Sequence, residues 1–240
     1  MRGADLFPVL AATWPQRTFA EVGPFVVPEP DAGGNRVSAA RLSDASGDTV
    51  EALDVVEAAM EVQGRAPLFQ VLDHQSTLEG ALGARGYIAR DHTDILVVEA
   101  KALAKVPPPV TAFDIWPPLA IQVELWAEGG IDAARLGVMH RAIGPKTSVF
   151  GRIKDQPAGA AYVAMDGDIA MLHALEITPH LRRNGLAAIM MEAAADWAVQ
   201  NGAAWLSVLV TQENAAAQGL YASLGLKPVG SYHYREKREP

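Results

Sequence analysis

One stretch constrains the fold more than any other: an apolar segment, a short basic loop and an amphipathic segment follow one another between residues 169 and 202. Residues 169–177 are nearly all apolar over the length of a strand, which is typical of a strand buried on both faces. Pro179 cannot donate to a strand ladder and ends this segment. From Leu186 to Gly202 the apolar residues recur at helical spacing. The stretch therefore predicts a strand, a tight loop and a helix.

The loop between this strand and helix has the composition of an anion-binding site. The start of a helix leaves about four backbone N–H groups without partners and carries a partial positive charge. Gly185 and Ala187 leave the backbone open to close approach, and Arg182 and Arg183 add fixed positive charge. The pattern predicts that the backbone N–H groups of residues 183–188 bind a phosphate. The spacing of these residues alone is equally compatible with an ordinary helix start that has two solvated arginines.

Two ordered motifs in this part of the chain resemble those of the GCN5-related N-acetyltransferases (GNAT). Residues 182–187 read Arg-x-x-Gly-x-Ala, which is similar to the acetyl-CoA pyrophosphate motif of that family, Arg/Gln-x-x-Gly-x-Gly/Ala. Residues 214–226 are similar to its second motif, Asn-x-x-Ala-x-x-x-Tyr-x-x-x-Gly-Phe, with Leu226 where Phe is usual. A strand lies between the two motifs, which makes the pair more specific than either alone. The resemblance covers about residues 112–240.

The resemblance implies an α/β (α+β) fold with a mixed, mostly antiparallel central sheet flanked by helices. The first half of the chain repeats the order of the second: residues 62–72 parallel 199–209, and residues 81–87 parallel 220–226. We interpret the chain as two tandem copies, a degenerate GNAT-like domain over residues 1–106 and a catalytic domain over residues 107–240. A chance likeness of amphipathic segments is the alternative.

The first copy lacks the chemistry of the second. Asp44 and Asp48 lie in the loop that corresponds to the arginine-glycine loop, and they would repel a pyrophosphate. Leu82 stands where the second copy has Tyr221. We therefore expect the first copy to contribute packing and to shape the acceptor pocket.

Local patterns predict the remaining elements. In the first half they indicate strands at 25–27, 35–42, 68–72 and 87–99, a helix at 49–63 capped by Asp48, a helix at 75–84, and a linker at 101–110. In the second half they indicate helices at 117–130 and 131–141 and strands at 146–153, 158–165 and 205–209. In the family, the helices that correspond to the first two of these form the wall of the acceptor site.

The resemblance also assigns the cofactor-binding residues. The backbone N–H groups of Leu175 to Ile177 would polarise the acetyl carbonyl, where the strand separates from its neighbour and admits the pantetheine arm. Because asparagine commonly caps helices, our first interpretation of Asn214 is a helix cap, and our second is a contact to the cofactor. The full set of expected acetyl-CoA contacts is Leu175, Ile177, Arg182, Arg183, Asn184, Gly185, Leu186, Ala187, Ala188 and Asn214.

Two residues are the candidates for proton transfer. Tyr221 corresponds to the family's acid for the departing thiolate, and the alternative is an aromatic packing residue. Glu176 is the candidate base, and the alternative is a carboxylate with a structural partner. His173 and His140 are weaker candidates, since a core or surface position is more common for each. No metal site is expected, because no further ligand lies at suitable spacing.

Composition limits the class of protein. The 240-residue chain has no cysteine, which excludes a disulfide framework, a thiolate metal site and a cysteine nucleophile. Its net charge of -8 argues against a broad surface that binds nucleic acid. No uncharged apolar segment of the sequence is long enough to span a membrane. We expect a cytoplasmic protein, with a monomer slightly favoured over a homodimer.

The function implied is the direct transfer of the acetyl group of acetyl-CoA to a primary amine of a small-molecule or peptide acceptor, without an acyl-enzyme. One alternative is a non-catalytic acyl-CoA-binding or regulatory protein of the same fold. A purely structural α/β protein is the other.

Overall fold

The computed structural model describes residues 1–237 of the chain. The first half contains η1 (Gly3–Leu6), α1 (Phe7–Thr13), β1 (Phe19–Val22), β2 (Phe25–Pro28), α2 (Asn35–Ser38), β3 (Arg41–Leu42), α3 (Leu53–Val62), β4 (Leu68–Leu72), α4 (Ser76–Ala84), β5 (Tyr87–Glu99) and α5 (Ala100–Leu103). The second half contains β6 (Ala112–Ile115), α6 (Ala120–Glu128), α7 (Ala133–Arg141), β7 (Lys146–Ile153), β8 (Gln156–Asp166), β9 (Ile169–Ile177), η2 (Pro179–Leu181), α8 (Leu186–Gln200), β10 (Trp205–Thr211), α9 (Ala215–Ser223) and β11 (Lys227–Lys237).

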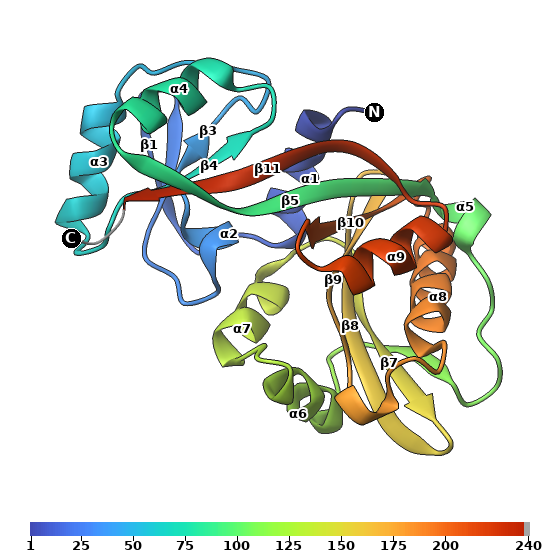
Figure 1. Cartoon of the computed structure of the whole chain (residues 1–240). Coiled ribbons are helices and arrows are strands. Elements are labelled where there is room, and N and C mark those ends of the chain that lie inside the picture. Colours follow the sequence, from blue (N-terminus) through green and yellow to red (C-terminus); the bar gives the residue numbers. More distant parts are fainter. Residues whose placement is uncertain (238–240) are drawn as a thin grey trace.

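One eight-stranded sheet joins the two halves of the chain, in the order β4-β11-β5-β10-β9-β8-β7-β6 (Figure 1). Only the β9–β10 pair in this sheet is parallel, so the sheet is mixed and mostly antiparallel, as the sequence predicts. β5, from the first half, lies between β10 and β11 of the second half. The boundary expected between residues 106 and 107 therefore does not divide this sheet. A second, three-stranded sheet has the order β1-β2-β3.

Three apolar cores hold the elements together. The first core covers one face of the large sheet and includes buried side chains of α1, α6 and α7, among them Trp126 and Val138. The second covers the opposite face and includes α5, α8 and the α9 residue Tyr221. The third packs α3 and α4 against β2 and β4. Within the described residues, no helix is long and apolar enough to cross a membrane.

The strand predicted at 35–42 is wrong. Residues Asn35–Ser38 form the short helix α2, and only Arg41–Leu42 form a strand. Gly34 has φ of 99°, a backbone conformation that favours glycine, and it starts the turn. The Ser38 hydroxyl donates to the carbonyls of Gly34 and Asp31 at 3.1 and 2.8 Å. These side-chain bonds outweigh the weak apolar alternation that suggested a strand.

The start and the cap of the next predicted helix also need correction. α3 begins at Leu53 rather than at residue 49, because Ala52 before it has a left-handed backbone with φ of 65°. Asp48 does not cap α3. Its carboxylate accepts the backbone N–H groups of Thr77 and Leu78, both at 2.8 Å, and so caps α4. The predicted linker at 101–110 begins within α5.

Most other boundaries agree with the sequence to within a few residues. The segment at 169–177 is β9, and the segment from Leu186 is α8, which runs to Gln200. The helices predicted at 117–130 and 131–141 are α6 and α7. Together these elements place the basic loop directly after β9, at the end of the parallel pair.

Candidate functional site

A cleft of about 890 Å³ lies where β9, the start of α8 and α9 meet. Every residue expected to bind acetyl-CoA or to transfer a proton lines it, with the exception of Asn184. The structure thus brings the two sequence motifs, which lie on either side of β10, to one place. The lining residues that sequence reasoning did not single out include Arg36, Leu209, Val210 and Thr211.

The cleft opens where β9 separates from β10. Their parallel pairing runs only from Trp205 opposite Ile169 to Val208 opposite Leu172. The register of β9 against β8 shifts just beyond, and Ala174 has φ of 54°. A bulge of this kind bends a strand and increases its twist. It therefore turns the end of β9 away from β10, as the resemblance implies.

The bulge is anchored from the face that carries α6. The buried indole of Trp126 donates from Nε1 to the Ala174 carbonyl at 2.8 Å. Gly129, at the end of α6, packs closely against the Glu176 side chain. A Cβ added at Gly129 would lie only 2.5 Å from Glu176 Cγ. These contacts fix the backbone of Leu175 to Ile177, which has no strand partner on the β10 side.

The start of α8 has an open backbone. Gly185 precedes the helix with φ of 80°, and no side chain caps it. The first helical hydrogen bond is donated by Ile189 to the Gly185 carbonyl at 3.2 Å. In the described chain, the N–H groups of Leu186, Ala187 and Ala188 have no protein acceptor. An added Cβ at Gly185 would meet nothing within 4 Å. This arrangement fits the pyrophosphate of an acyl-CoA.

The two arginines beside this helix start have different surroundings. Arg182 is engaged by the protein: its Nε donates to the Ile177 carbonyl at 2.9 Å, and its Nη2 pairs with Glu176 Oε1 at 2.8 Å. Arg183 is exposed, has φ of 65° and forms no ion pair within residues 1–237. Asn184 donates to the carbonyls of Leu181 and Arg182, which stabilises the loop. Of these two arginines, Arg183 is therefore the one whose charge is available to a ligand.

Glu176 has both a position in the cleft and a structural partner. Its side chain is 19% exposed and forms the ion pair with Arg182. The second carboxylate oxygen, Oε2, faces Gly129 at the end of α6. Arg182 thus holds one oxygen and leaves the other beside the end of α6.

Tyr221 and Asn214 come from α9 and the turn before it. Burial raises the pKa of the Tyr221 phenol to about 12, so this side chain remains protonated near neutral pH. Its hydroxyl has no hydrogen-bond partner among residues 1–237, although Tyr221 lines the cleft. The Asn214 side chain accepts the Ala217 N–H at 3.1 Å and caps α9. Capping is thus the observed role of Asn214.

His173 lines the cleft and has partners on both ring nitrogens. The Thr13 hydroxyl donates to the Val9 carbonyl and so accepts from His173 Nε2 at 3.0 Å. His173 Nδ1 then accepts from Arg36 Nη1 at 3.4 Å. Burial, and secondly the charge of Arg36, hold the pKa of His173 well below its usual value. This histidine is a neutral, oriented imidazole, whereas the exposed His140 lies outside the cleft against Trp116.

Comparison with known protein families supports the resemblance. Residues 117–226 match the family described as "Acetyltransferase (GNAT) family". A 57-residue part of the chain is 37% identical to "Uncharacterized N-acetyltransferase YobR" of Bacillus subtilis (strain 168). That match spans 24% of this chain and 23% of the length of the Bacillus protein.

Solved structures share the fold over nearly the whole chain. A GCN5-related N-acetyltransferase from Kribbella flavida is similar with a TM-score of 0.74 and 18% identity, over 96% of this chain and 93% of that one. A tandem GNAT protein from the clavulanic acid biosynthesis pathway is similar with a TM-score of 0.62 and 14% identity, over 88% and 76%. The chain therefore has a mixed α/β GNAT fold.

Proposed function

We propose that this chain is an acetyl-CoA-dependent N-acetyltransferase that acetylates a primary amine of a small-molecule or peptide acceptor directly. The observation that carries the proposal is the convergence of both motifs on one cleft. At that cleft the uncapped start of α8 supplies free backbone N–H groups, and the pairing of β9 with β10 ends. The match of residues 117–226 to the GNAT family gives independent support.

The N–H groups of residues 186–188 and the side chain of Arg183 would hold the pyrophosphate. The backbone of Leu175 to Ile177 would donate to the acetyl carbonyl oxygen as negative charge develops there, an effect of about 3 kcal/mol for one such donor. When bound, acetyl-CoA supplies the activated acetyl group and a thiolate leaving group.

The two proton transfers are assigned to Glu176 and Tyr221. Glu176 would take a proton on Oε2 from the attacking amine as the carbon–nitrogen bond forms. Tyr221 would donate its proton to sulfur as the carbon–sulfur bond breaks, which its buried and protonated state supports. Arg182, bound to Glu176 Oε1, would orient the carboxylate.

The tandem origin of the chain belongs to the same proposal, with a degenerate copy in residues 1–106 and the catalytic copy in residues 107–240. The order β4, α4, β5 in the first half matches β10, α9, β11 in the second. β5 and β11 are adjacent at the centre of the four strands β4-β11-β5-β10, and all three pairs are antiparallel. An approximate two-fold axis between β5 and β11 accounts for this arrangement.

The test compares Gly185→Glu with the matched control Gly185→Ala. Both variants have the same unfavourable backbone conformation, but only glutamate places bulk and negative charge at the helix start. Acetyl-CoA at 100 times its dissociation constant should stabilise the wild type by about 2.7 kcal/mol in thermal unfolding. We expect this stabilisation to persist in the alanine variant and to be absent from the glutamate variant.

A wild type that acetyl-CoA does not stabilise would refute the proposal. Stabilisation without release of CoA, on any amine of a broad panel, would indicate instead the non-catalytic acyl-CoA-binding protein. The folded state of each variant is checked by its unfolding transition without ligand.

A further inference from the structure

Arg36 is a cation that lines the cleft. It forms no ion pair with a carboxylate among residues 1–237, and its Nε is shielded from solvent without a hydrogen-bond partner. Its neighbours are neutral. His173 is the uncharged acceptor described above, the ring of Trp14 lies 5.7 Å from the guanidinium carbon, and the hydroxyls of Tyr232 and Tyr234 lie nearby.

Two other partly buried arginines have carboxylate partners. Arg141 binds Asp31 and the Pro15 carbonyl, and Arg235 binds Glu79 and the Tyr87 carbonyl. A partly buried guanidinium without a carboxylate partner is costly, since the hydrogen bond to the neutral His173 replaces only part of the water that its donors lose. Burial acts to lower the pKa of Arg36, but the two tyrosines outweigh it and raise that pKa, so the group stays charged.

Arg36 lies on the side of the sheet opposite to the basic loop. Val37 beside it, together with Trp14 and the helices α6 and α7, belongs to the first core, whereas the start of α8 belongs to the second. The same cleft is lined by Arg36 and by Arg182, Arg183 and residues 185–188. A ligand bound to the loop and a second ligand bound at Arg36 would therefore approach the gap between β9 and β10 from opposite faces.

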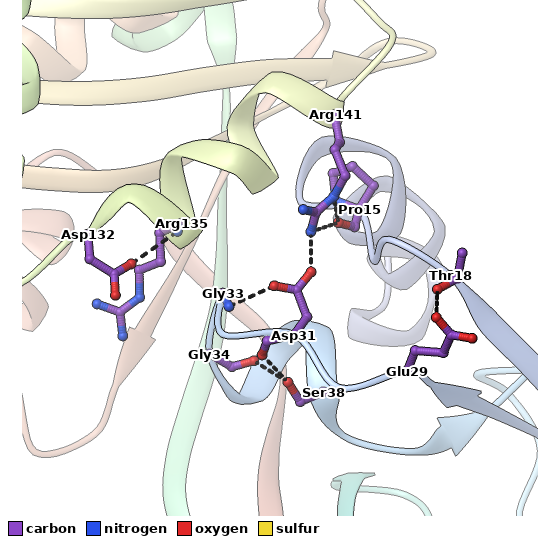
Figure 2. A network of polar contacts seen from close by, with 10 residues as sticks. All are labelled: Pro15, Thr18, Glu29, Asp31, Gly33, Gly34, Ser38, Asp132, Arg135 and Arg141. Carbon is purple, nitrogen blue, oxygen red and sulfur yellow. Dashed lines mark hydrogen bonds and ion pairs between the residues drawn. The ribbon is translucent and has the colours of Figure 1, made fainter. Parts of the chain in front are cut away.

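The turn that precedes Arg36 is held against α7. The Asp31 carboxylate pairs with Arg141 of α7 at 2.6 Å and accepts the Gly33 N–H at 2.9 Å. Figure 2 shows both contacts. The Ser38 hydroxyl closes the other end of α2 on the Asp31 and Gly34 carbonyls. An added Cβ at Gly33 would lie 2.5 Å from Val138 of α7, so the turn before α2 packs tightly on that helix.

We propose that Arg36 is the binding site for a carboxylate of the acceptor, and that the acceptor is an amino acid or a related small amino-carboxylate rather than a simple amine. The inference rests on the proposed acetyltransferase function. A guanidinium forms bidentate, charge-assisted hydrogen bonds to a carboxylate, and this geometry would fix the orientation of the amine toward the acetyl group. The first half of the chain thereby contributes a specificity residue to the site of the second.

The experiment uses matched probes, free L-amino acids and the corresponding L-amino acid amides, which keep the amine and lose the negative charge. We expect kcat/KM for CoA release from acetyl-CoA to favour at least one amino acid over its amide by about 10-fold or more. In the presence of saturating CoA, the same amino acid should raise the thermal unfolding temperature more than its amide does.

Arg36→Gln should abolish the difference between acid and amide, whereas Arg36→Lys should retain part of it because the charge remains. The control is Arg17→Gln, at an exposed arginine outside the cleft, which should leave the preference intact. Stabilisation by acetyl-CoA alone should be equal in all four proteins, and its absence from the wild type would be a failure of the proposed function instead.

Amides that equal or exceed the acids in the wild type would overturn the proposal, and this comparison needs no variant to fold. It would also be overturned if no amino acid stabilised the CoA complex, or if the preference for the acid survived in a folded Arg36→Gln protein.

Discussion

Thr93 of β5 pairs directly with Tyr232 of β11, and the row of paired residues continues to Thr211 of β10 on one side and Leu72 of β4 on the other. The row is symmetric about its centre. If Leu72 corresponds to Thr211 and Thr93 corresponds to Tyr232, the outer pairs exchange with each other and the central pair maps onto itself. The match of Thr93 with Tyr232 continues the parallel of residues 81–87 with 220–226, whereas the parallel of residues 62–72 with 199–209 matches Leu72 with Leu209, two residues before Thr211. The strand order and the antiparallel pairing thus support the proposed tandem origin, with a shift of two residues between β4 and β10.

β5 of the first half lies between two strands of the second half, and β11 of the second half lies between two strands of the first. We therefore predict that neither residues 1–106 nor residues 107–240 fold when produced alone. Each fragment would expose a long strand with an unpaired edge and lose buried partners such as Tyr232. Mixing the fragments should restore the native circular dichroism spectrum. A fragment of residues 107–240 that unfolds cooperatively by itself would contradict this prediction.

Tyr221→Phe should lower kcat by about 100-fold or more, because general acid catalysis contributes that much. Acetyl-CoA affinity should be unchanged, and so should the free energy of unfolding to within about 1 kcal/mol, since the hydroxyl has no protein hydrogen bond in the described chain. The control is Tyr162→Phe, which loses the bond to the Met139 carbonyl at 3.1 Å and should destabilise the protein. An unchanged kcat in Tyr221→Phe would leave this tyrosine as a packing residue.

The sequence predicts the cofactor side of the site because its chemistry is local. β9, the basic loop and the start of α8 lie within residues 169–188, and the spacing of their apolar, basic and glycine residues carries the signal. The Asn214 cap of α9 is part of this local signal. The ion pair of Glu176 with Arg182 has no such signal in the sequence.

The acceptor side is not predictable in the same way. Arg36 falls in a segment whose alternation suggests a strand, and only the bonds to Asp31 and the packing on α7 make it a helix. The left-handed Ala174, which turns β9 away from β10, has no local signature either. Likewise, the position of β5 between β10 and β11 depends on pairing between residues distant in sequence. In this segment the sequence signal for the turn before α2 is the Gly33-Gly34 pair.

Asp31→Ala should destabilise the protein by about 1–3 kcal/mol, because it leaves the Arg141 guanidinium without its carboxylate and frees the turn before α2. The Asp31 side chain is only 5% exposed and that of Arg141 23%, so solvent screens this pair incompletely. Asp54→Ala is the control: Asp54 is 87% exposed, and its loss should cost less than about 1 kcal/mol. Urea unfolding of the variants measures both values, and equal effects would show that the Asp31 pair is no stronger than a surface pair.

Protonation of His173 should destabilise the fold in acid. Its pKa lies well below the usual value in the folded protein, from burial first and then from the charge of Arg36, whereas in the unfolded chain it is about 6.5. The unfolded chain therefore binds more protons below about pH 6.5, and stability falls as the pH falls through that value. Above it the contribution is fully present. The slope from this one group approaches about 1.4 kcal/mol per pH unit.

The measurement is the free energy of unfolding in urea between about pH 7 and about pH 5, for the wild type and His173→Gln. Glutamine keeps a polar group beside Thr13 and Arg36 but binds no proton, so the variant should be less stable near neutral pH and lose less stability on acidification. His233, whose pKa burial also lowers, has a slope of the same sign and remains in both proteins. His233→Gln therefore serves as the parallel control. Equal acid slopes in wild type and His173→Gln would show that the imidazole accepts a proton within the fold, and Arg36 would then face a charged neighbour rather than a neutral one.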